Sequence, residues 1–198
     1  MKLKNCFLTV FCAFIFFCVQ GQSVKSPSVF LGYELGSRFT RHHMVVDYFK
    51  YVGATLNNVK YEQYGESNES RPLFVTYISS QKNIDNLDKI RKANLAQSKN
   101  KETNLNENIA IVWLSYNVHG NEASATESAM KTLYELVTSK KEWLKNTVVI
   151  MDPCLNPDGR DRYVNWYNQV KSSPYDIDKM AIEHNEPWPG GRPNHYLF

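Results

Sequence analysis

The sequence has few cysteines, no large excess of charge and no repeats, and each absence narrows the class of protein. Three of its four cysteines lie within the first 18 residues, so Cys154 is the one cysteine of the remaining chain. A disulfide within that remainder and a metal site built from cysteines are both excluded. A formal net charge of +3 over 198 residues gives no reason to expect nucleic acid as a partner. We find no internal repeat, low-complexity segment or domain linker.

The N-terminus has the pattern of an export signal. Two lysines precede an apolar run from Cys6 to Val19, and small residues stand before a cleavage site after Gly21. The run is shorter than the ~20 residues that a membrane span needs. We therefore expect residues 1–21 to be a signal peptide and residues 22–198 to be a secreted or periplasmic chain without stable membrane insertion. An uncleaved anchor is the alternative.

The rest of the chain is organised around one junction between a strand and a helix. The apolar, β-branched segment Ile109 to Leu114 is typical of a buried strand, and an apolar stripe predicts a helix through about Leu136. Between them stand His119 and Glu122, in the kind of crevice where α/β sheets bind ligands. Their side chains can reach one zinc ion if the backbone turns between them, and Gly120 gives the backbone that freedom. A carboxylate that complements the helix dipole is the alternative for Glu122.

A second motif follows a second apolar strand. Residues 147–151 form the strand, and Asn156-Pro-Asp-Gly159 has the composition of a tight turn in which glycine accepts a positive φ. Such a turn would hold Arg160 or Arg162 near the crevice of His119. An arginine there could bind a carboxylate or stabilise an oxyanion. Pairing of these arginines with a neighbouring aspartate is the alternative.

The other clear patterns predict two helices and a strand hairpin. The expected elements are a helix from Thr40, as N-cap, to Gly53, strands Val59–Tyr64 and Leu73–Ser79, and a helix Ile84–Leu95. His42 and His43 lie in the first turn of the first helix. Because adjacent helical residues point about 100° apart, we interpret this pair as surface or packing residues rather than metal ligands.

Several short patterns accompany the two motifs in a fixed order. They are Arg38-Phe-Thr-Arg-His-His, Tyr64-Gly65, Arg71-Pro72, then Val-His119-Gly-Asn-Glu122 and Asn156-Pro-Asp-Gly159. Together they resemble the zinc metallocarboxypeptidases of the carboxypeptidase A type, most closely the secreted bacterial members. The resemblance covers roughly Gly32 to Phe198.

The resemblance implies that His119 and Glu122 are two zinc ligands and that a histidine from later in the chain is the third. Zinc held in this way keeps one position for water, whose pKa falls toward ~7. The general-base glutamate is expected beyond residue 198, so we assign no catalytic residue within this chain. Peptides or proteins are the implied substrates. We assign substrate binding to Arg162, with Arg160 and Arg192 as rivals.

Departures from the family pattern bear on activity. Asn121 stands where some relatives carry arginine, and the family's Asn-Arg pair, third histidine, substrate-sensing tyrosine and general-base glutamate have no counterparts up to Phe198. His184 and His195 are alternatives for the third ligand. We expect residues 22–198 to be the N-terminal part of a catalytic domain with an α/β fold. Its mixed β-sheet would be flanked by helices on both faces and would lack its C-terminal strands, which leaves an open edge.

The expected function is zinc-dependent release of C-terminal residues from peptides. One alternative is a non-catalytic exported protein that binds zinc or peptide, with Tyr163, Trp166 and Tyr167 as a contact surface. Aromatic clusters of this kind are more often packing residues. The other alternative is a zinc amidase or deacylase of the same fold, acting on cell-wall peptides or N-acyl amino acids.

Overall fold

The computed structural model describes residues 23–99, 109–122, 124–171, 178 and 180–186. The expected signal peptide, Arg192 and His195 lie outside these residues. The strands are β1 Val59–Glu66, β2 Pro72–Ile78, β3 Ala110–Ser115 and β4 Thr147–Asp152. The helices are α2 Pro27–Leu31, α3 His42–Thr55, α4 Gln81–Ile84, α5 Leu87–Gln97, α6 Ala125–Val137 and α7 Pro157–Val170, with the 3-10 helices η1 Lys141–Lys145 and η2 Ile182–His184. None of the helices in this described part is long and apolar enough to cross a bilayer.

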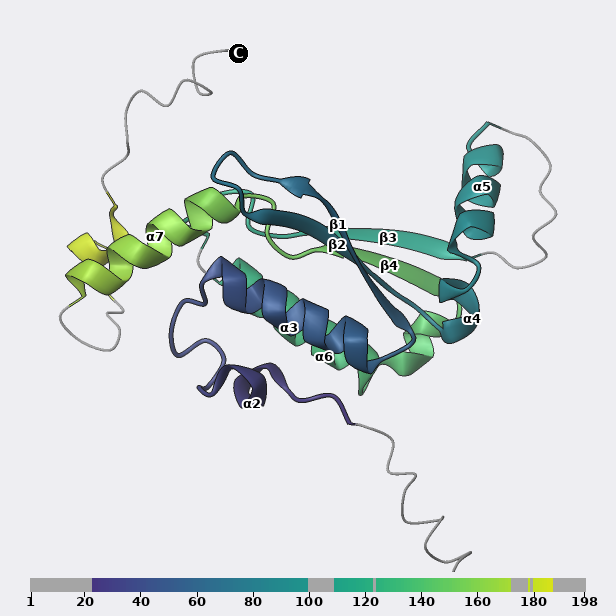
Figure 1. Cartoon of the computed structure of the whole chain (residues 1–198), viewed down its shortest axis with the longest axis horizontal. Coiled ribbons are helices and arrows are strands. Elements are labelled where there is room, and N and C mark those ends of the chain that lie inside the picture. Colours follow the sequence, from purple (N-terminus) through teal and green to yellow (C-terminus); the bar gives the residue numbers. More distant parts are fainter. Residues whose placement is uncertain (1–22, 100–108, 123, 172–177, 179, 187–198) are drawn as a thin grey trace, which may run out of the picture.

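The four strands form one mixed sheet in the order β1-β2-β4-β3, which confirms the predicted fold class (Figure 1). β1 and β2 form the predicted antiparallel hairpin, β2 is antiparallel to β4, and β3 is parallel to β4. In the parallel pair Ser115 lies opposite Asp152, so the two strands end side by side. The loops that carry the two sequence motifs therefore start from neighbouring positions.

Helices α3 and α6 cover one face of the sheet (Figure 1). Each has an apolar stripe with residues spaced three or four apart, as an amphipathic helix requires. The stripes are Val45, Phe49 and Val52 in α3 and Ala129, Leu133 and Leu136 in α6, and they pack into one core with Phe74, Ile78, Val149 and Met151 of the sheet. Burying each large apolar side chain stabilises the fold by about 1.5–3 kcal/mol.

The ends of α3 differ from the prediction. Arg41, not Thr40, is its N-cap, and the helix continues through Gly53 to Thr55. The Arg41 side chain makes no capping bond. Instead, the carboxylate of Asp161 in α7 accepts a hydrogen bond of 2.8 Å from the backbone N–H of His42. A carboxylate from a distant element thus satisfies the helix N-terminus, and no local pattern could reveal it.

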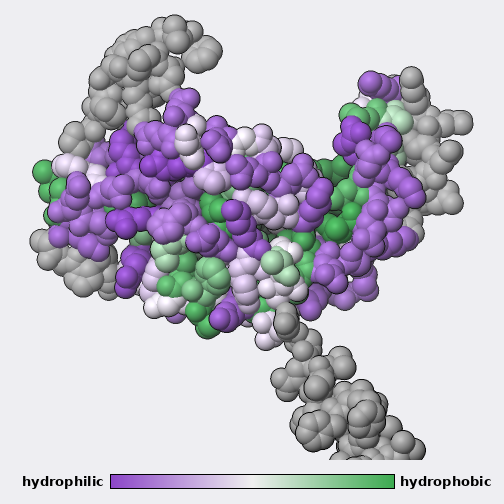
Figure 2. Space-filling model, viewed as in Figure 1, coloured by the Kyte–Doolittle hydropathy of each residue, from purple (hydrophilic) through white to green (hydrophobic). Residues whose placement is uncertain are grey.

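Strand β3 is exposed, so the prediction of a buried strand is wrong. Its apolar side chains Ile111, Val112 and Trp113 are 36%, 40% and 59% exposed, because β4 is its one strand neighbour in the described part of the chain. On the face opposite α3 and α6, a groove of about 550 Å³ runs between the sheet and α5. Figure 2 shows hydrophobic residues gathered where α5 meets the body. The expectation of an open edge with uncovered apolar surface therefore holds for the described residues.

Candidate metal centre

His119 and Glu122 lie in the loop that leaves the carboxyl end of β3. The backbone carbonyl of His119 accepts a hydrogen bond from the Glu122 N–H at 3.1 Å. In return, the Glu122 carboxylate accepts from the His119 N–H at 3.2 Å. These two bonds close one tight turn, in which both residues are exposed. Glu122 precedes α6, whose first turn carries Glu127 as its acidic residue, so Glu122 is not the first-turn carboxylate of that helix.

The turn depends on Asn117 and Gly120. Asn117 has a φ of 55°, in the left-handed region that asparagine adopts more readily than most residues. Its side-chain Nδ2 donates to the His119 carbonyl at 2.6 Å. Gly120 was predicted to give the backbone the freedom to turn here, but its φ is not positive, so the turn does not use the conformations that only glycine adopts readily. A Cβ at Gly120 would lie 2.1 Å from the carbonyl carbon of Gly159, so glycine is required because two backbones meet there.

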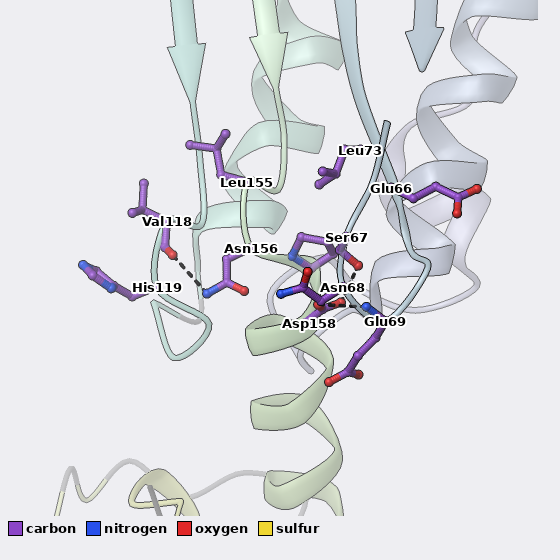
Figure 3. A pocket seen from close by; sticks show the side chains of 11 residues that line it. Glu66, Ser67, Asn68, Glu69, Leu73, Val118, His119, Leu155, Asn156 and Asp158 are labelled. Carbon is purple, nitrogen blue, oxygen red and sulfur yellow. Dashed lines mark hydrogen bonds between the residues drawn. The ribbon is translucent and has the colours of Figure 1, made fainter. Parts of the chain in front are cut away.

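The second motif begins a helix, so the prediction that it forms a tight turn is wrong. Asn156 is the N-cap of α7, and its Oδ1 accepts from the Gly159 N–H at 2.9 Å. Pro157 occupies the first turn, where its missing N–H costs nothing. The other end of the Asn156 amide, Nδ2, donates to the Val118 carbonyl at 3.2 Å (Figure 3). One side chain therefore caps the helix and holds the loop of His119.

Backbone hydrogen bonds continue the pairing of β3 with β4 beyond the strands. The N–H of Tyr116 donates to the carbonyl of Asp152 at 3.0 Å, and the N–H of Leu155 donates to the carbonyl of Tyr116 at 3.0 Å. The N–H of Asn156 then donates to the carbonyl of Asn117 at 3.1 Å. The two motifs, 37 residues apart if counted from His119 to Asn156, are thus one structural unit. The prediction that this turn holds Arg160 or Arg162 near the crevice of His119 is wrong, because neither arginine lines the pocket beside His119.

A pocket of about 770 Å³ opens beside this unit (Figure 3). Its walls are Val118 and His119, residues 155–158 at the start of α7, and residues 66–69 with Leu73 from the β1–β2 hairpin.

Asp158 joins two of the pocket walls. Its Oδ1 accepts from the Ser67 hydroxyl at 2.6 Å and from Arg71 Nη1 at 2.8 Å. Burial alone would raise the pKa of Asp158, but these hydrogen bonds hold it below the ordinary carboxyl value. The ionised carboxylate therefore ties the β1–β2 hairpin to the start of α7.

The two arginines after the second motif have different environments. Arg160 is fully buried, and its Nη2 lies 2.6 Å from the Glu127 carboxylate, so it belongs to the protein interior. Arg162 is partly exposed, and its Nε and Nη2 donate to the two carboxylate oxygens of Glu186 at 3.2 and 3.0 Å. It also lines a smaller pocket of about 350 Å³. Of the two, Arg162 is the one within reach of a ligand.

The described residues contain no group of three or more His, Cys, Asp or Glu side chains arranged to hold a metal ion. His184 contacts α7 instead: its Nδ1 lies 3.3 Å from the Tyr163 hydroxyl, and its ring centroid lies 5.4 Å from that of Tyr167. Both tyrosines lie beyond the helix start that contacts the loop of His119. The nitrogen and oxygen donors of His119 and Glu122 fit zinc chemically, and they are one ligand short of the three that a catalytic zinc uses.

Sequence reasoning missed the asparagines that shape this centre. Sequence patterns at Asn117 and Asn156 could have indicated their roles. Asparagine tolerates the left-handed region, and asparagine followed by proline is an N-cap and N1 pattern.

The candidate centre thus consists of two parallel strands, one leading into the His-x-x-Glu turn and the other into an asparagine-capped helix. The family model described as zinc carboxypeptidase matches residues 46–196, most of the sequence. The chain belongs to the zinc carboxypeptidase family.

One solved structure supports the fold. The chain is similar to the carboxypeptidase A from Helicoverpa armigera, with 18% identity and a TM-score of 0.50 over 70% of this chain and 29% of that chain. It is also similar to bovine thrombin-activatable fibrinolysis inhibitor, solved in complex with tick carboxypeptidase inhibitor, with 16% identity, a TM-score of 0.45, and coverage of 68% and 35%. The chain thus spans about a third or less of the length of these relatives. No curated protein matches it.

Proposed function

We propose that this chain contributes to a zinc-dependent metallocarboxypeptidase, which hydrolyses peptides from the C-terminal end. The observation that carries the proposal is the turn of His119 and Glu122 at the end of β3, beside a pocket of about 770 Å³, in a member of the zinc carboxypeptidase family. In this proposal both side chains are zinc ligands. Residues 22–198 would be the N-terminal part of the catalytic domain, exported by the signal peptide 1–21.

The metal would supply Lewis-acid polarisation of the scissile carbonyl and a lowered pKa for a bound water. The chain's own residues bind and orient. His119 and Glu122 donate one nitrogen and one oxygen, and the pocket beside them receives the peptide. Because the described residues offer two ligands, the third ligand and the general base are expected from residues outside the described part.

Arg162 is the proposed group for the substrate carboxylate. Its guanidinium already holds a carboxylate in a two-point arrangement, that of Glu186. This is the geometry in which arginine binds carboxylates most strongly. A substrate carboxylate that binds here would replace Glu186, so substrate affinity would include the cost of breaking that pair.

The test is hydrolysis by the complete product of the gene, with peptides that end in a free carboxylate and matched peptides that end in an amide. We expect release of the C-terminal residue from the free peptides only, and loss of activity in His119→Ala and Glu122→Ala. Arg162→Ala should raise the KM for free peptides. Equal hydrolysis of both peptides would contradict a carboxypeptidase and would favour an amidase or deacylase of the same fold.

The shortage of ligands among the described residues favours one second candidate, an exported protein without catalysis that binds zinc or peptide. The packing of the aromatic residues argues against the contact surface that this candidate needs. Tyr163 and Tyr167 are buried, with ring centroids 5.4 and 4.7 Å from that of Phe39. The coding sequence after residue 198 separates the candidates, because an in-frame Asn-Arg pair and a later histidine would favour the enzyme.

A further inference from the structure

We propose that Asn117 and Asn156 are positioning residues that fix the backbone on both sides of His119 and so preset the direction in which its side chain leaves the main chain. The inference rests on the proposed function, because it gives these residues a part in metal binding. It assigns a role to two side chains that neither bind the metal nor line the zinc coordination sphere themselves.

The evidence is a pair of hydrogen bonds to consecutive carbonyls. The Val118 carbonyl accepts from Asn156 Nδ2 at 3.2 Å, and the His119 carbonyl accepts from Asn117 Nδ2 at 2.6 Å. These carbonyls belong to the two peptide planes that flank the Cα atom of His119. Because a peptide group is rigid and planar, anchoring both planes fixes the φ and ψ of His119. The Cα–Cβ direction of this residue is then fixed as well.

The two asparagines are themselves anchored. Asn117 is 2% exposed, and its Oδ1 accepts from the Cys154 thiol at 3.2 Å. The Oδ1 of Asn156 accepts a hydrogen bond from the N–H of Gly159 in the first turn of α7. Each amide thus has one end on the β4–α7 segment and the other end on the loop. The loop is thus tied both to the segment between β4 and α7, through Cys154, and to the start of α7, through Asn156.

His119 is held through hydrogen bonds to backbone groups and not through its ring. A histidine that ligates a metal usually donates its second ring N–H to a carboxylate or carbonyl, which sets the orientation of the ring. In the described part of the chain, the exposed imidazole of His119 has no hydrogen-bond partner, while its backbone N–H and carbonyl both have one. The asparagines therefore set the position of the His119 Cα–Cβ bond through the main chain, and the ring itself is left free to rotate.

Substitutions can separate positioning from helix capping. Asn156→Asp keeps the Oδ1 acceptor that caps α7 and removes only the donor to the Val118 carbonyl, since aspartate is an equally good N-cap. Asn117→Gly keeps the left-handed backbone and removes the donor to the His119 carbonyl. Asn86→Asp is the matched control: it removes an amide donor from a carbonyl, that of Lys82 at 2.7 Å, far from the loop.

The first measurement is the backbone order parameter of residues 118–120 in the metal-free chain, from nitrogen-15 relaxation. We expect values near ~0.85 in the wild type and in Asn86→Asp, and a fall toward ~0.6 in Asn156→Asp and Asn117→Gly. Unchanged values in both loop variants would overturn the inference, whether or not the chain binds zinc.

The second measurement is zinc affinity by calorimetry on the same proteins. We expect each loop variant to bind about ten-fold more weakly, while Asn86→Asp binds as the wild type does. A looser loop with unchanged zinc affinity would overturn the positioning role. A wild-type chain that binds no zinc at His119 would remove the metal from the proposed function, and the relaxation data would still decide whether the asparagines fix the loop.

Discussion

The buried pair of Arg160 and Glu127 offers a sharp test of what holds α6 and α7 together. Arg160 Nη2 lies 2.6 Å from Glu127 Oε1, and the side chains are 0% and 8% exposed. Replacing Arg160 by methionine keeps most of the volume and removes the positive charge. The Glu127 carboxylate would then be buried without its countercharge, which costs about 3–5 kcal/mol in comparable cases.

The contacts that remain around Glu127 place the expected loss of stability at the lower end of that range. Glu127 would keep two donors, the Thr40 N–H at 2.6 Å and the Thr126 hydroxyl at 3.0 Å. We therefore expect Arg160→Met to lower the free energy of unfolding by about 3 kcal/mol, or the melting temperature by roughly 6–12 °C. Urea unfolding at pH 7, followed by circular dichroism, measures it. The control is Arg91→Met, whose pair with Asp88 is exposed on both sides and whose loss should leave the free energy of unfolding nearly unchanged.

The double variant Arg160→Met with Glu127→Leu separates pairing from packing. Removing both charges leaves no unpaired ion, so the double variant should be more stable than Arg160→Met alone. A loss below about 1 kcal/mol in the single variant, or a double variant that is less stable still, would refute the reasoning.

Two further predictions concern close packing and pH. Gly120→Ala forces a Cβ to within 2.1 Å of the Gly159 carbonyl carbon, so we expect a loss of about 1–3 kcal/mol together with weaker zinc binding. Gly65→Ala, with nothing within 4 Å, should leave zinc binding unchanged in the same assays, and equal effects of the two substitutions would contradict the contact. Burial lowers the pKa of His42, so the unfolded chain binds more protons and stability falls as pH drops below about 6.5. Urea unfolding at pH 7.5 and 5.5 should show this dependence reduced in His42→Asn and kept in His43→Asn, and the same pH dependence in both variants would count against it.

Sequence patterns identified the four strands and three of the six α-helices of the described residues, α3, α5 and α6, because those patterns are local. Alternation and β-branched residues predicted the hairpin, and a 3.6-residue period predicted α6. The burial of β3 could not be predicted in the same way, because the exposure of Trp113 depends on which strand lies next to it. The cap of α3 was missed for a related reason, since it comes from Asp161, 119 residues away.

The sequence proposed the two candidate ligands of the centre and missed the residues that support their loop. His119 and Glu122 were assigned from their spacing and their position after a strand. Gly120 was correctly singled out for the wrong reason, because a sequence does not distinguish a glycine needed for its φ from one needed for a close backbone contact. The division between Arg160, inside the fold, and Arg162, at its surface, also required three-dimensional neighbours.

The most direct test of the account is a zinc titration of the purified chain and of its His119→Ala, Glu122→Ala and His43→Ala variants. The account predicts one weak site, because the described residues offer two ligands, fewer than the three or four that zinc sites use. Each of the first two substitutions should abolish that site, and His43→Ala should leave it unchanged. Zinc binding that survives both His119→Ala and Glu122→Ala would contradict the assignment of these residues as metal ligands.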